Sequence, residues 1–178
     1  MAEIRVLAAA TIFGAALIVS GSLASWAQED PSLKGCNAAV GTFLTKSFKE
    51  GASGDDYIAR SLFSLTNGGH AFFTDSGQRG EAGYRPFSDG RGAWRCVSGA
   101  DGKSRFQAVI LDFVFKTEDD QSEEIGRLDF DAVVDDKTGK LESRATLYFV
   151  PLGANPMHAS TLGEGQKFEL VGEKIAAP

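Results

Sequence analysis

The stretch RLDFDAVVDDKTGKLESRATLYF, residues 127–149, decides the fold because apolar and polar residues alternate along two runs on either side of a turn. The first run places Leu128, Phe130, Ala132 and Val134 on one face. Residues 135–139 then form the turn, and the second run places Leu141, Ala145, Leu147 and Phe149 on one face. A period of two with one apolar face predicts an antiparallel hairpin with one side buried.

Similar alternation extends outward from this hairpin over most of the chain. Further strands are predicted over residues 40–48, 57–65, 70–75, 92–97, 104–116 and 166–173. Residues 67–69 and 100–102 have the composition of tight turns. Eight sequential strands with almost no helix predict an all-β fold, an eight-stranded antiparallel up-and-down barrel in which the last strand pairs with the first.

One segment permits a different fold. Ile58, Leu62 and Leu65 also match the spacing of a helical stripe, and a helix there would give an α+β cone of the nuclear-transport-factor-2-like kind. The strand is favoured because the intervening residues suit a pleat and Asn67-Gly68 is a strong hairpin turn.

Residues 1–27 have the pattern of a signal peptide. Arg5 precedes an apolar run over residues 6–19, and Ser25 and Ala27 form the cleavage signal, so the mature protein is expected to begin at Gln28 and to be secreted or periplasmic. The apolar run is shorter than the roughly 18–20 residues that a membrane anchor needs. A lipidated Cys36 is disfavoured because Lys34 occupies a position that calls for a small or apolar residue.

Residues 28–178 have the length of a single domain. The whole chain has 18 Lys and Arg against 24 Asp and Glu, and the leader contains one of each kind, so the mature part keeps a net charge of −6. This balance argues against nucleic acid and against a membrane surface as partners after leader removal. Cys36 and Cys96 both follow the leader and are expected to form a disulfide, which would stabilise the fold by on the order of 4 kcal/mol.

The chain combines the leader, the single domain, the eight strands, the paired cysteines and Gly92-Ala93-Trp94. In these shared features it resembles the small secreted lipocalin-like, or calycin, barrels. Those proteins carry their Gly-x-Trp motif on the first strand, whereas here it falls on the fourth, so the resemblance is one of architecture. It implies a cup that holds a small apolar ligand and transfers no site residue.

Asp112 is the first candidate site residue, because it shares a face of its strand with Phe106, Ala108, Ile110 and Val114. If that face points inward, the carboxyl group can receive a donor group of a ligand. If the opposite face points inward, Asp112 faces water. The alternation leaves both orientations open.

The long loop between Ser76 and Ala93 holds the other candidates. As a lid, Tyr84 and Phe87 would pack on an apolar ligand while the arginines Arg79, Arg85 and Arg91 hold its carboxylate or phosphate. As a solvated loop, which the composition favours, the same arginines would pair with the abundant acidic residues.

Catalytic and metal-binding patterns are missing from the sequence. The two histidines, His70 and His158, stand on different segments, and there is no Gly-x-Ser-x-Gly motif, so we expect no metal and no cofactor. The leading hypothesis is a secreted barrel that binds a small hydrophobic or amphipathic molecule without covalent chemistry. The alternatives are a barrel enzyme of isomerase or cyclase type, with Asp112 and His70 as first candidates, and a filled barrel that serves protein interaction.

Overall fold

The computed structural model describes residues 33–80 and 84–176, so the predicted signal peptide lies outside the described residues. The described part contains eight strands and two short 3-10 segments, η2 (Asn37–Ala39) and η4 (Ala159–Thr161). The strands are β1 (Gly41–Lys49), β2 (Ala59–Leu65), β3 (His70–Asp75), β4 (Gly90–Ala100), β5 (Lys103–Val114), β6 (Glu124–Asp135), β7 (Lys140–Pro151) and β8 (Gln166–Lys174).

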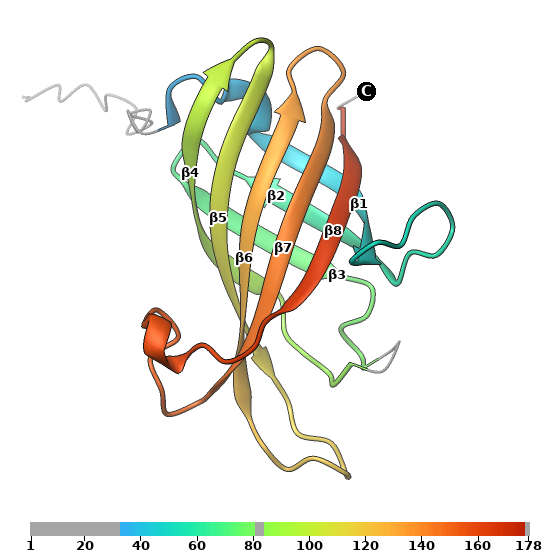
Figure 1. The fold of residues 1–178 in the computed structure, drawn as a ribbon, viewed down its shortest axis with the longest axis vertical. Coiled ribbons are helices and arrows are strands. Elements are labelled where there is room, and N and C mark those ends of the chain that lie inside the picture. Colours follow the sequence, from blue (N-terminus) through green and yellow to red (C-terminus); the bar gives the residue numbers. More distant parts are fainter. Residues whose placement is uncertain (1–32, 81–83, 177–178) are drawn as a thin grey trace, which may run out of the picture.

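The strands form a closed barrel in sequence order, as Figure 1 shows. Every neighbouring pair is antiparallel, and β8 closes the barrel against β1, with Phe43 opposite Lys174 and Lys49 opposite Phe168. The predicted all-β up-and-down barrel is confirmed. Residues 59–65 form a strand, so the helix that the cone-shaped alternative required is absent from this segment.

The predicted loop between Ser76 and Ala93 is shorter than expected, because β4 already begins at Gly90. Gly90 and Gly92 therefore belong to the barrel wall. A Cβ at Gly92 would collide with the carbonyl oxygen of Val109 on β5, so only glycine allows the two strands to approach at this point. These two glycines are close-packing residues of a strand.

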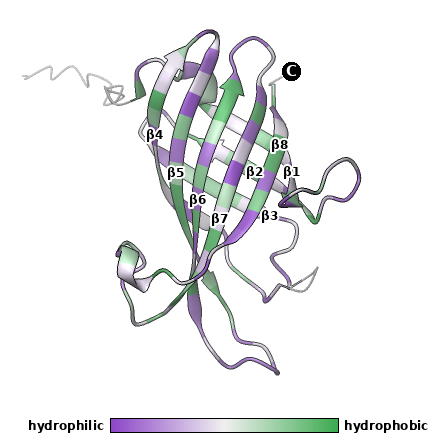
Figure 2. Ribbon diagram, viewed as in Figure 1, coloured by the Kyte–Doolittle hydropathy of each residue, from purple (hydrophilic) through white to green (hydrophobic). Residues whose placement is uncertain are grey.

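The alternation read from the sequence matches the inner and outer faces of the barrel. In Figure 2, hydrophobic and hydrophilic residues alternate along the strands. On β6 the side chains of Leu128, Phe130, Ala132 and Val134 are buried inside. On β5 the buried residues include Phe106, Ala108, Ile110, Asp112 and Val114, which decides the orientation that the sequence left open.

One half of the interior is filled with side chains, and we call it the closed half. Phe63 is fully buried at its centre, with ring-centroid distances of 4.8 Å to Phe130 and 6.0 Å to Phe106. Trp94 packs edge-on against Phe106 and donates its indole N–H to the carbonyl oxygen of Thr66 at 2.9 Å. This half lies at the upper end in Figure 1, beside the β4–β5 and β6–β7 turns.

A disulfide fastens the segment before β1 to the closed half. Cys36 and Cys96 are bonded, with a Cα–Cα distance of 5.7 Å, and Cys36 is fully buried. The segment approaches β4 so closely that a Cβ at Gly99 would collide with the Gly35 backbone. The predicted disulfide is confirmed in the structure, and it is of the kind found in oxidising compartments.

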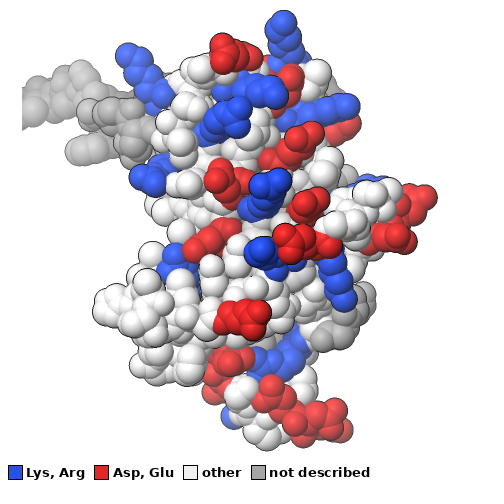
Figure 3. Space-filling view, viewed as in Figure 1, with Lys and Arg blue, Asp and Glu red and all other residues white. Residues whose placement is uncertain are grey.

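On the face shown in Figure 3, acidic and basic side chains are intermixed over the strands. Acidic side chains gather at the lower tip, where the loop between β5 and β6 contains Glu118, Asp119, Asp120 and Glu123. Within the described ranges, no helix is long and apolar enough to cross a bilayer.

Candidate functional site

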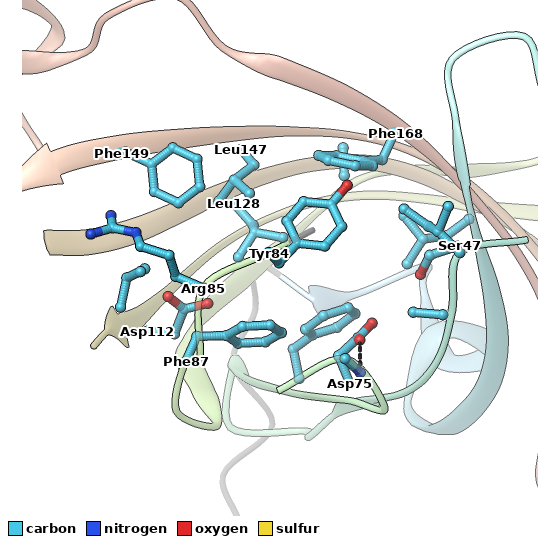
Figure 4. A pocket seen from close by; sticks show the side chains of 17 residues that line it. Ser47, Asp75, Tyr84, Arg85, Phe87, Asp112, Leu128, Leu147, Phe149 and Phe168 are labelled. Carbon is cyan, nitrogen blue, oxygen red and sulfur yellow. Dashed lines mark hydrogen bonds between the residues drawn. The ribbon is translucent and has the colours of Figure 1, made fainter. Parts of the chain in front are cut away.

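The other half of the barrel, which we call the open half, contains a cavity of about 90 Å³. A single water molecule needs about 10–15 Å³, so this space holds several waters or a small ligand. The cavity is lined by Ser47, Ile58, Ala59, Phe73, Asp75, Gly77, Tyr84, Arg85, Phe87, Asp112, Val114, Leu128, Ala145, Leu147, Phe149, Phe168 and Leu170. Figure 4 shows these side chains converging from opposite walls of the barrel.

The segment Tyr84–Ser88 forms part of the cavity wall and is tied to the end of β5. The Ser88 N–H donates to the carbonyl oxygen of Phe113 at 2.9 Å, and the Phe115 N–H donates to that of Pro86 at 2.8 Å. Phe87 also forms an isolated bridge with Val114. Both aromatic residues that the sequence proposed for a lid, Tyr84 and Phe87, line the cavity. The segment Tyr84–Ser88 is therefore packed against the barrel rather than free in solvent.

Arg85 fastens the same segment to the β5–β6 hairpin. Its guanidinium forms ion pairs with Asp120, at 3.1 Å, and with Glu124, and it donates to the hydroxyl of Ser122 at 2.8 Å. It also lies 6.0 Å from the ring centroid of Phe149. Arg85 lines the cavity while its charge is directed to acidic partners, so the expected pairing of loop arginines with acids holds at this position.

Asp112 is the most unusual polar group of the site. It is 7 % exposed, and its Oδ1 has no hydrogen-bond partner among the described residues. Burial raises the pKa of Asp112 to about 7, and the backbone N–H of Gly126 on β6 offsets only part of that effect. The carboxyl fits because Gly126, its partner in the strand register, has no side chain; a Cβ there would collide with Oδ1.

A chain of hydrogen bonds crosses the opposite wall from β1 to β3. The hydroxyls of Ser47 and Ser61 are 3.0 Å apart, and Ser61 donates to Oδ2 of Asp75 at 2.7 Å. Oδ1 of Asp75 accepts the N–H of Gly77 at 2.7 Å. Each member of the chain has a partner, in contrast to Asp112. Desolvation, and secondarily the charge of Asp75, raise the pKa of Tyr84.

Three of the candidate residues lie away from the cavity. Arg79 is exposed on the β3–β4 loop, and Arg91 is exposed on β4, where its position beside inward Gly90 and Gly92 turns it outward. His70 is exposed at the start of β3 and does not line the cavity that Asp112 lines, so the structure does not bring these two residues together.

Ser47, Asp75 and Phe168 line the cavity and were missed as site residues. A signal for two of them was present in the sequence: Ser47 shares its alternation with inward Phe43, and Asp75 shares its alternation with inward Phe73. A polar residue at an inward position of a barrel strand indicates either a polar network or a ligand site.

Comparison with protein-family models, with curated proteins and with solved structures finds no match to this chain. Within residues 33–80 and 84–176 no group of three or more His, Cys, Asp or Glu side chains is placed to hold a metal ion.

Proposed function

We propose that this protein binds a small hydrophobic or amphipathic molecule in the open half of the barrel. The observation that carries the proposal is the unequal filling of the interior, in which a packed half adjoins a cavity of about 90 Å³ with apolar walls and few polar groups. Ligand sites commonly combine apolar walls with a few placed polar groups. The open half offers Asp112 and the Ser47–Ser61–Asp75 chain as those groups.

The two alternative functions have less support. A filled barrel that serves protein interaction predicts an occluded interior, which a cavity of this size does not favour. An isomerase or cyclase based on Asp112 and His70 requires both groups at one site, and His70 does not line the cavity.

We further propose that the protein acts outside the cytoplasm. The leader pattern of residues 1–27 and the Cys36–Cys96 disulfide support a secreted or periplasmic location. Mass spectrometry of the protein purified from its own host tests this: the expected amino-terminal residue is Gln28, and retention of residues 1–27 would contradict the proposal.

The binding proposal is tested by filling the cavity. Leu147→Trp enlarges a side chain that lines it, whereas Arg144→Trp adds the same group at an exposed position of the same strand. Isothermal titration with n-hexanol should show binding to the native protein and to Arg144→Trp, with at least about tenfold weaker binding to Leu147→Trp. Equal affinity for all three proteins, or no binding to any of them, would contradict the proposal.

A further inference from the structure

We propose that the ligand is a small apolar amine whose ammonium group pairs with the carboxylate of Asp112. The inference rests on the proposed binding function and goes beyond it by assigning the charge of the ligand and the residue that recognises it.

Asp112 is a buried acid whose carboxyl group lacks a compensating partner. Its residue surface is 7 % exposed, Oδ1 lacks a hydrogen bond within the described part of the chain, and the side chain lines the cavity. Burying an ionised carboxylate without compensation is costly, and the raised pKa of Asp112 reflects that cost. An ammonium group entering the cavity would supply the missing charge and donor N–H groups.

The charged residues on the neighbouring elements do not supply that compensation. On the β3–β4 loop, Arg85 forms ion pairs with Asp120 and with Glu124 of β6. On β4, Arg91 is exposed on the outer face of the barrel. Opposite Asp112 on β6 stands Gly126, which contributes only backbone.

The remainder of the cavity also favours a cation over an anion. Asp75 is a second acidic side chain in the wall, and its hydrogen bonds from Ser61 and Gly77 are those of an acceptor. The wall includes the aromatic rings of Phe73, Tyr84, Phe87, Phe149 and Phe168. Figure 4 shows Phe87 beside Asp112, and Tyr84 and Phe168 farther along the cavity. Aromatic faces attract cations and also pack against an apolar body, whereas a ligand carboxylate would meet two acids.

The test compares three probes that share one alkyl chain: hexylamine, n-hexanol and hexanoate. At pH 8, titration calorimetry with the native protein should give hexylamine an affinity at least about tenfold higher than n-hexanol, with hexanoate weakest. Asp112→Asn should remove the preference for the amine, so that the variant binds hexylamine no more tightly than n-hexanol. Asp131→Asn, an exposed acid on the outer face of β6, is the matched control and should keep the preference.

The pH dependence in the native protein gives a second readout that needs no variant. Hexylamine stays protonated through neutral pH, as a lysine side chain does. Because pairing requires ionised Asp112, hexylamine affinity should fall by up to about tenfold for each pH unit below about 7, while n-hexanol affinity stays nearly constant.

The outcomes separate this inference from the proposed function. If n-hexanol binds but hexylamine binds no more tightly, or if Asp112→Asn keeps the preference, the amine assignment is wrong and the binding function stands. If Asp112→Asn does not fold, a flat pH profile for hexylamine overturns the assignment and a falling one supports it. If no probe binds, both proposals fail together.

Discussion

Three strands change character as they pass from the closed half of the barrel to the open half. The inward residues of β1 run from Phe43 to Ser47, those of β3 from Ala71 and Phe73 to Asp75, and those of β5 from Phe106 and Ile110 to Asp112. In the closed half these positions carry apolar side chains, among them the rings of Phe43 and Phe106. In the open half the same alternation turns hydroxyl and carboxyl groups toward a cavity.

Under the proposed binding function, the closed half serves stability and the open half serves recognition. Burying the rings around Phe63 stabilises the fold, because each aromatic side chain removes a large apolar area from water. Burying Asp112 without a hydrogen bond to Oδ1 has the opposite effect. We therefore expect changes in the closed half to alter mainly the free energy of unfolding, and changes in the open half to alter mainly ligand binding.

The largest effect is expected from removing the disulfide of the closed half. The double variant Cys36→Ala, Cys96→Ala should lose about 4 kcal/mol of unfolding free energy, because the unfolded chain is no longer constrained. Urea denaturation measures the loss. If the variant remains folded, its affinity for n-hexanol should match that of the native protein, since the cavity lies in the other half. A large change in affinity with unchanged stability would break the comparison.

A pair of phenylalanine truncations compares the halves directly. Phe63→Ala should destabilise the fold by about 3 kcal/mol, because it leaves a void that the neighbouring rings fill only partly. Phe87→Ala should lose only about 1 kcal/mol, because that half-buried ring borders space that is already empty. Thermal or urea unfolding of both variants checks the order, and a larger loss for Phe87→Ala would reverse the assignment of the halves.

Asp112 should make the free energy of unfolding fall as the pH rises, which is the reverse of the usual effect of an acidic residue. Its pKa rises on folding from an ordinary 3.8 to about 7, so between these pH values the folded state binds more protons than the unfolded state. Below about pH 4 the carboxyl is neutral in both states, and its contribution to stability is fully present. Ionisation then lowers the free energy of unfolding as the pH rises toward 7, and above about pH 7 the contribution is lost.

Asp112→Asn removes this dependence. The shift corresponds to about 4 kcal/mol at pH 8 relative to the neutral carboxyl. The carboxamide buries two N–H donors where the neutral carboxyl buries one O–H, which offsets about half of that gain, so the variant should be about 2 kcal/mol more stable than the native protein at pH 8. Urea unfolding at pH 4 and pH 8 measures the difference, with Asp131→Asn as control. A native protein that gains stability through Asp112 as the pH rises would contradict the assignment.

The sequence predicts the closed half better than the open half, and for a physical reason. Alternation with a period of two determines strand, face and register wherever one face is uniformly apolar, as it is for Leu128, Phe130, Ala132 and Val134. The same rule left the orientation of Asp112 undecided, because both faces of its strand carry apolar residues. Phe113, for example, is apolar but exposed. Only the pairing of β5 with β4 and β6 settles the orientation.

The loop residues were harder to predict, because their positions depend on contacts between distant segments. Tyr84 and Phe87 reach the cavity because the backbones of Pro86 and Ser88 form hydrogen bonds with the end of β5. Arg91 belongs to the same predicted loop, yet it stands on a strand because Gly90 and Gly92 allow β4 to approach its neighbours closely.

The smallest effect is expected at Arg85, which links the Tyr84–Ser88 segment to the β5–β6 hairpin. Arg85→Gln removes its ion pairs with Asp120 and Glu124, and because such pairs contribute little at a partly exposed site, the unfolding free energy should fall by at most about 1 kcal/mol.

Local order should respond more than global stability to this change. The amides of Ser88 and Phe115, which bond across the segment that Arg85 fastens, should exchange hydrogen faster in Arg85→Gln, while the amide of Ala108 in the middle of β5 keeps its protection. Lys116→Gln breaks an exposed pair with Glu123 on the same hairpin and should leave all three amides unchanged. Equal exchange in the native protein and in Arg85→Gln would show that the backbone hydrogen bonds alone hold the Tyr84–Ser88 segment, and that Arg85 does not contribute to the local order of the open half.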